Sequence, residues 1–210
     1  MKRSLLLTCL LLVLLNGSLP AQAVLQNESF ESSGIFPAPG WRTLRTTTLV
    51  NGAFTLQNVA LTTNPACIAS PGGGSNVMMF NSFSANLNDT VLMVTKPFDF
   101  SNNGGNNPTF SFYMYRDNGF LANNDRVRVY INTVPDINGA TLLTNTLGTT
   151  DILRRYNGAP FAAANTWNQY SYSLPAATYN GKRYYFIFSG ICGDGNNIYI
   201  DQVQTNTWPS

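Results

Sequence analysis

Residues 109–115 (TFSFYMY) and residues 126–132 (RVRVYIN) decide the fold, because both alternate between apolar and more polar side chains. Successive side chains of a strand point to opposite faces, so this period of two predicts two half-buried β-strands. The predicted core faces carry Phe110, Phe112, Met114, Val127, Val129 and Ile131. The opposite faces carry Ser111, Tyr113, Tyr115, Arg126, Arg128, Tyr130 and Asn132. The polar connection between the two stretches is typical of a hairpin loop.

Other short runs of aromatic and β-branched residues stand between clusters of Asn, Gly and Pro, which is the pattern of strands and turns. They predict strands at residues 77–80, 90–95, 167–174, 182–189 and 198–204. Helix is limited to one turn at residues 161–164, and residues 102–107 and 151–160 are predicted as exposed loops. The predicted fold class is therefore all-β, with two antiparallel sheets packed as a β-sandwich. Periodicity alone leaves jelly-roll, immunoglobulin-like and other Greek-key wirings open.

The N-terminal residues predict export. Lys2 and Arg3 precede an apolar run at residues 5–15, and residues 21–23 (AQA) have the small-x-small pattern that signal peptidase cleaves. The apolar run is shorter than the roughly 20 residues that a membrane span needs. We predict a secretory signal peptide at residues 1–23 and a single β-sandwich domain at residues 24–210. The mature protein is expected to be secreted, in the extracellular space or at the cell surface.

The predicted domain carries almost no net charge. Twelve basic residues less Lys2 and Arg3 leave ten, against ten acidic residues. A nucleic-acid partner would need a basic stripe, so none is expected. No second apolar run reaches membrane length, so no membrane insertion is expected either.

Cys67 and Cys192 both belong to the predicted domain. In an oxidising compartment an even pair of cysteines predicts a disulfide bond. Closing so long a loop would stabilise the fold by about 4–5 kcal/mol on the chain-entropy model. The alternative is two separate buried thiols, since neither cysteine has metal-ligand spacing with any partner.

The chain contains no histidine. This excludes Ser-His-Asp and Cys-His catalysis within the chain and removes the commonest general base. A carboxylate pair of the kind that glycosidases use is not excluded by counting, because ten acidic residues remain. The acids of the 116–125 connection, Asp117 and Asp125, stand in contexts that are typical of turns. We therefore predict that the protein is not an enzyme.

Segments at both ends of the domain resemble galactose-binding-like jelly-roll modules. Residues 27–31 (NESFE) and 36–41 (FPAPGW) are similar to their opening strand and loop, and residues 196–203 (NNIYIDQV) are similar to their last strand. The pattern resembles that of the MAM-like, choice-of-anchor J and cleaved-adhesin domains of secreted bacterial proteins. Carbohydrate-binding modules of glycoside hydrolases are more distant. The resemblance implies jelly-roll wiring for the predicted sandwich.

In the resembling modules a structural calcium ion often ties the first strand to the last. Carried over by position, this implies Glu31 and Asp201 as metal ligands, with Glu28 as a weaker candidate. Calcium takes oxygen ligands, so it needs neither His nor Cys. Many relatives have two consecutive acids in the last strand, whereas Gln202 follows Asp201 here. The alternative is that these carboxylates only solvate the strand ends.

Aromatic residues near arginines suggest a ligand surface, because sugar rings stack on Tyr and Trp while polar neighbours bond to the hydroxyls. The candidate ligand-binding residues are Trp41, Tyr113, Tyr115, Tyr130 and Arg128. The alternative is that the tyrosines are ordinary β-sheet composition and that Trp41 belongs to the core.

The leading functional hypothesis is a secreted, non-catalytic binding or adhesion module for carbohydrate or a surface glycoprotein, with a structural calcium site. A structural or protein-interaction domain without a small ligand is the first alternative, and a secreted hydrolase is the second. This sandwich fold hosts many ligands, so the fold alone does not decide between them.

Overall fold

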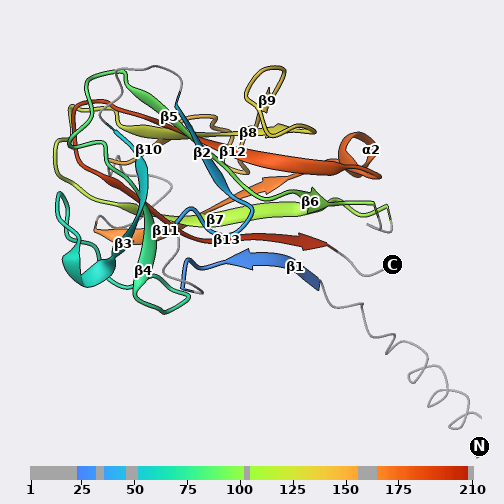
Figure 1. Ribbon diagram of the computed structural model, residues 1–210, viewed down its shortest axis with the longest axis horizontal. Helices are drawn as coiled ribbons and strands as arrows, with labels where there is room; N and C mark the ends of the chain where they lie inside the picture. Colours follow the sequence, from blue (N-terminus) through green and yellow to red (C-terminus); the bar gives the residue numbers. More distant parts are fainter. Residues whose placement is uncertain (1–22, 32–35, 46–51, 102–104, 156–164, 208–210) are drawn as a thin grey trace, which may run out of the picture.

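Two antiparallel β-sheets pack face to face in the computed structural model of the protein, which describes residues 23–31, 36–45, 52–101, 105–155 and 165–207 (Figure 1). In chain order the elements are β1 (Ala23–Glu28), β2 (Arg42–Arg45), β3 (Phe54–Asn58), the 3-10 helix η1 (Val59–Leu61), β4 (Asn76–Phe80), β5 (Thr90–Val94), β6 (Phe98–Asp99), β7 (Thr109–Arg116), β8 (Arg126–Asn132), β9 (Thr141–Leu142), β10 (Ile152–Leu153), β11 (Thr166–Ser173), α2 (Ala176–Tyr179), β12 (Arg183–Ile191) and β13 (Ile198–Thr207). The all-β sandwich predicted from the sequence is confirmed.

The two sheets interleave strands from distant parts of the chain. Sheet A has the order β11-β7-β13-β4-β3, with β1 also paired to β13. Sheet B has the order β10-β8-β12-β5-β2, with β6 paired to β12 and β9 to β8. Connections therefore cross between the sheets at the ends of the sandwich, as in a jelly roll. The first and last strands lie side by side, from Ala23 opposite Thr207 to Glu28 opposite Val203.

Aromatic side chains build the core between the sheets. Phe110 of β7 stacks on Phe186 of β12 with ring centroids 3.8 Å apart, and Phe112 meets Phe188 edge to face at 5.0 Å. All four rings are fully buried. The predicted core faces of the two deciding stretches are confirmed, because every one of their apolar members belongs to this cluster.

Some details differ from the sequence prediction, which did not include strands β2, β3, β6 and β9. Ile152 and Leu153, within a predicted loop, form β10 because they pair with the start of β8. The short helix α2 follows Pro175, a position that the sequence analysis did not single out. The predicted signal peptide up to Gln22 and the predicted helical turn at residues 161–164 lie outside the described residues. Among the residues that are described, no helix is long and apolar enough to cross a lipid bilayer.

The predicted disulfide bond is wrong, because Cys67 and Cys192 are both free and buried. Cys67 belongs to a cluster on the outer face of sheet A, whereas Cys192 belongs to the main core. The Cys192 thiol donates to the carbonyl oxygen of Ser82 at 3.4 Å. Burial is the main cause that raises the pKa of both thiols, so both stay protonated at neutral pH. The alternative of two separate buried thiols is the one observed.

The aromatic core makes a direct prediction about stability. Replacing Phe186→Ala removes the ring that stacks on Phe110, and we expect a loss of about 3–5 kcal/mol in the free energy of unfolding, measured with chemical denaturant. Phe83→Ala is the matched control, because Phe83 is 50% exposed. It should change stability by less than about 0.5 kcal/mol. Equal effects of the two substitutions would contradict the assignment of the core.

Candidate functional site

The three acids predicted as metal ligands lie in the region where the first strand meets the last. Glu28 ends β1 and pairs with β13, and Asp201 lies in β13 opposite Tyr113 of β7. One extra residue between Asp201 and Gln204 makes a β-bulge in β13, and Gln202 has a φ of 50° there. Bulges re-aim side chains and are common next to functional sites. Beside this bulge Asp201 contacts Ser70, at the start of the turn that precedes β4.

Glu31 fixes the backbone of that turn. Its Oε1 accepts hydrogen bonds from the backbone N–H of Ser75 at 2.8 Å and of Asn76 at 2.6 Å. Gly74 has a φ of 96°, and a Cβ there would lie 2.4 Å from the same oxygen, so only glycine fits. The second oxygen, Oε2, makes only a 3.3 Å contact to the Asn76 amide. Glu31 thus keeps one oxygen that is weakly engaged.

Asp201 is the most deeply buried of the three acids, at 1% exposure. Its Oδ2 accepts the Ser70 hydroxyl, and its Oδ1 accepts the backbone N–H of Gln202 at 2.7 Å. Burial is the main cause that raises the pKa of Asp201 to about 7; the hydrogen bonds from Ser70 and Gln202 oppose this rise, and the negative charges of Glu31 and Glu28 add to it. Among the described residues, no ion pair involves any of these three carboxylates.

The donor set has the chemistry that calcium prefers, because it consists of carboxylate and hydroxyl oxygens. The described side chains, however, supply only part of a calcium coordination shell. Glu28 accepts the backbone N–H of Phe30 at 2.7 Å, and Glu31 holds the turn before β4. Within the described part of the chain, no three Asp, Glu or Cys side chains converge closely enough to form a metal cluster. An ion at this place would need backbone carbonyls or water for its remaining positions.

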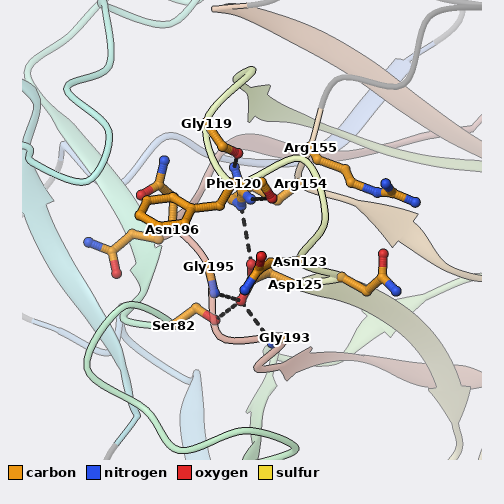
Figure 2. Close-up of polar contacts among 12 residues, drawn as sticks. Ser82, Gly119, Phe120, Asn123, Asp125, Arg154, Arg155, Gly193, Gly195 and Asn196 are labelled. Atoms are coloured by element: carbon orange, nitrogen blue, oxygen red, sulfur yellow. Dashed lines mark hydrogen bonds and ion pairs between the residues drawn. The ribbon is translucent and has the colours of Figure 1, made fainter.

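A second polar cluster, which the sequence analysis did not predict, lies at the loop end of the sandwich (Figure 2). Arg154 lies between two aspartates: it pairs with Asp117 and approaches Asp125 at 3.4 Å. None of the three side chains is more than 3% exposed. The Asn196 amide also donates to Asp117, at 2.6 Å. Burying a guanidinium with two carboxylates is tolerable only because each charge has charged and hydrogen-bonded partners.

Arg154 also organises the loop between β7 and β8. It donates to the carbonyl oxygen of Gly119 at 3.1 Å and to that of Phe120 at 3.4 Å. Phe120 has a φ of 48°, an unusual conformation for a bulky residue, and its side chain is 53% exposed. The buried arginine therefore holds a strained loop tip in one position.

Asp125 ties the same loop to the turn between β12 and β13. Its Oδ1 accepts the Ser82 hydroxyl and the backbone N–H groups of Gly193 at 2.8 Å and Gly195 at 3.2 Å. A Cβ on Gly193 would lie 2.3 Å from the backbone of Asn124, and one on Gly195 would lie 2.1 Å from Asp125. Gly193 and Gly195 were therefore the residues in the sequence that could have indicated a close approach of the β12–β13 turn to the β7–β8 loop.

The five candidate ligand-binding residues do not form one surface. Trp41 is 6% exposed and packs in the core between Phe30 and Phe188, which removes it as a surface contact. Tyr115 is also buried, in the cluster on the outer face of sheet A. Tyr113 is half-buried on that same face.

Tyr130 and Arg128 remain together, but on the outer face of sheet B. Strand register places Tyr130 in one row with Ile187 and Val94, and it places Arg128 in the next row with Ser189 and Leu92. The members of these rows on β5 and β12 are buried. Half-buried side chains pack around them, namely Leu44, Tyr130, Ile137, Ala140 and Tyr185. We call this surface the outer face of sheet B.

Solved structures share the fold. The K1 cleaved adhesin domain of Lys-gingipain from Porphyromonas gingivalis W83 matches with a TM-score of 0.58 and 20% identity, covering 86% of this chain and 96% of that domain. The K2 cleaved adhesin domain of Lys-gingipain matches with a TM-score of 0.60 and 21% identity, covering 86% and 98%. The jelly-roll fold that the resemblance implied is therefore confirmed, and it is the fold of cleaved adhesin domains.

An enzyme has a similar fold too. The stig cyclase Fisc from Fischerella sp. TAU, solved in complex with a pyrrolidinylidene indole, matches with a TM-score of 0.56 and 11% identity, covering 90% of this chain and all of that one. No protein-family model matches the chain, and no curated protein sequence matches it. At these identities the likeness defines the fold and leaves the function to the chemistry of the surface.

The buried arginine predicts a large effect on stability. Arg154→Leu would leave Asp117 and Asp125 buried without their cation, so we expect a loss of about 3–5 kcal/mol in the free energy of unfolding. Arg183→Leu is the control, because its pair with Asp99 at 3.0 Å is exposed on both sides. That substitution should cost less than about 1 kcal/mol. A small effect of Arg154→Leu in denaturant unfolding would show that the cluster does not stabilise the fold.

Proposed function

We propose that this protein is a secreted, non-catalytic module that binds carbohydrate on the outer face of sheet B. We further propose that a calcium ion stabilises the junction of its first and last strands. The fold shared with the adhesin domains of Lys-gingipain supports a binding role, and the predicted signal peptide supports export. The absence of histidine argues against most acid–base catalysis.

The observation that carries the binding proposal is the composition of the outer face of sheet B. Tyr130 and Tyr185 are half-buried there, over the fully buried Ile187 and Val94. Arg128 lies two residues from Tyr130 on the same strand face, about 7 Å along β8. An aromatic ring beside a guanidinium offers stacking for a sugar ring and hydrogen bonds for its substituents.

The calcium proposal rests on the charges around Asp201. Three carboxylates lie in one region, and burial together with the charges of Glu31 and Glu28 raises the pKa of the buried one, Asp201, to about 7. A divalent cation would remove this repulsion. Glu31 can offer its weakly engaged Oε2, and Asp201 and the Ser70 hydroxyl lie next to each other. The ion would supply stability rather than chemistry.

A protein-interaction domain is the second candidate function, and a specific surface favours it. Four large apolar side chains are about half exposed or more on the loops at the end of the sandwich that carries Arg154: Phe83, Leu87, Phe120 and Leu121. Exposed apolar patches of this kind often mark protein contacts. The two candidates use different surfaces, so variants can separate them.

A glycan array tests the carbohydrate proposal. We expect specific binding that Tyr130→Ala weakens about tenfold or more, because the stacking ring is lost. Tyr113→Ala is the matched control, since Tyr113 is also a half-buried tyrosine but lies on the outer face of sheet A. A blank array with folded protein would overturn the proposal, and so would equal losses from the two variants.

Thermal melting at several pH values tests the calcium proposal. In chelator, stability should fall as pH rises from about 4 to about 7. The native state keeps a proton on Asp201 that the unfolded state has already released, so unfolding releases a proton and becomes easier as pH rises. Calcium should raise the melting temperature more at pH 8 than at pH 5, because protons compete for the same oxygens. At a calcium concentration of 100 times Kd the gain is about 2.7 kcal/mol.

Two variants sharpen the calcium test. Asp201→Asn keeps the size of the side chain and an oxygen that can accept the Ser70 hydroxyl, but it should abolish both the pH dependence and the calcium response. Asp99→Asn should leave the calcium response unchanged, because Asp99 belongs to an exposed pair with Arg183. Identical melting of the unmutated protein in calcium and in chelator would refute the proposal.

A further inference from the structure

We propose that the carbohydrate bound on the outer face of sheet B is an acidic polysaccharide whose uronate carboxylate pairs with Arg126. This inference rests on the proposed function and names the chemical class of its ligand. It rests on the fact that two neighbouring arginines, Arg126 and Arg128, both pair with the carboxylate of Asp151.

Arg128 already has a complete carboxylate partner. Its Nε lies 2.5 Å from Oδ1 of Asp151, and its Nη2 lies 3.3 Å from Oδ2, so the pair is bidentate. This hydrogen-bonded pairing is the main cause that raises the pKa of Arg128, with a smaller contribution from the Tyr130 hydroxyl. Arg128 therefore acts as a fixed side chain next to Tyr130.

Arg126 is left with an incomplete set of partners. The same Asp151 is its ion-pair partner, but at 3.4 Å, and its Nε is buried and makes no hydrogen bond. One hydrogen bond goes from Nη1 to the carbonyl oxygen of Asn124 at 3.1 Å. A guanidinium offers five N–H donors in a planar fork, and the Arg126 side chain is 23% exposed. Because Nε is buried, a second carboxylate would pair with the Nη end of this fork, whereas Asp151 binds Arg128 through Nε and Nη2.

The remaining charges near this face do not supply that carboxylate. Arg42 adds a third guanidinium on the outward side of β2, and it donates to the carbonyl oxygen of Pro135. Asp136, on the loop that follows β8, turns its Oδ1 to the backbone N–H of Asn138 at 2.8 Å. Three arginines thus face two aspartates, and the surplus positive charge falls beside Arg126. An anionic ligand is complementary to this charge.

The sequence of groups along β8 matches a carboxylated sugar chain. Arg126, Arg128, Tyr130 and Asn132 follow one another on the outward side of β8 at intervals of about 7 Å. The ring of Tyr130 can stack on one sugar while a cation two or four residues away meets the carboxylate of another. A carboxylate is planar and fits the arginine fork edge to edge, so we commit to uronate rather than sulfate.

Calorimetric titration of the mature protein tests the inference with three defined probes. These are tetragalacturonate, its fully methyl-esterified form and a sulfated carrageenan tetrasaccharide that contains no uronate. We expect tetragalacturonate to bind at least tenfold more tightly than its ester. Its affinity should also fall between about 0.1 M and about 1 M salt, where the Debye length shrinks from about 10 Å to about 3 Å.

Variants assign the effect to one side chain. Arg126→Gln should reduce tetragalacturonate affinity about tenfold or more and leave the weak affinity for the ester unchanged. Arg126→Lys keeps the charge but not the fork, so it should recover only part of the loss. Arg183→Gln should have no effect, because Arg183 is far along β12 and has its own partner, Asp99. Melting curves of each variant confirm that it is folded.

Each outcome separates this inference from the proposed function. Equal binding of tetragalacturonate and its ester, lost in Tyr130→Ala, would overturn the uronate inference and support carbohydrate binding. Binding of the carrageenan probe alone would also overturn it. If Arg183→Gln lowered the affinity for tetragalacturonate as much as Arg126→Gln, the effect would reflect the overall charge of the protein, and the assignment to Arg126 would be overturned. No binding of any probe, together with a blank glycan array, would defeat both proposals.

Discussion

The contact of Phe110 on Phe186 and of Phe112 on Phe188 is the interaction on which the rest of the structure depends. These rings join β7, which neighbours the central strand β13 of sheet A, to β12 at the centre of sheet B. Because side chains alternate along a strand, fixing the inward faces of these two strands also fixes what faces outward in the strands paired to them. Asp201 on one outer face and Tyr130 on the other owe their positions to the same aromatic core.

Buried charges occur in two different arrangements in this protein, one around Arg154 and one around Asp201. Around Arg154, one guanidinium lies between two carboxylates that also accept backbone and side-chain hydrogen bonds, and together these groups hold three loops (Figure 2). Around Asp201, three carboxylates share a region in which none of them takes part in an ion pair between described residues, and the pKa of Asp201 rises to about 7. The first arrangement contains its own cation, whereas in the second the repulsion and burial are expressed as a raised pKa of Asp201.

Alternation along the chain was enough to predict the sandwich and the inward faces of β7 and β8. It could not predict which residues from distant segments meet. Trp41 sits in a loop without periodicity, so only the packed core shows that it is buried. Cys67 and Cys192 are separated by sheet A, a fact that depends on strand order. Arg154 belongs to no motif, and its partners are 29 and 37 residues away.

The pairing of β1 with the end of β13 has a consequence for architecture. Both ends of the domain leave from neighbouring positions, on the side of the molecule opposite the loops that surround Arg154 (Figure 1). A domain with adjacent termini can be inserted into a surface loop of a host protein with little disturbance to either fold. An inserted domain of this kind would be connected to its host through β1 and the end of β13. The outer face of sheet B would then lie along one side of the domain, and the loops around Arg154 would lie at the end that is farthest from the host.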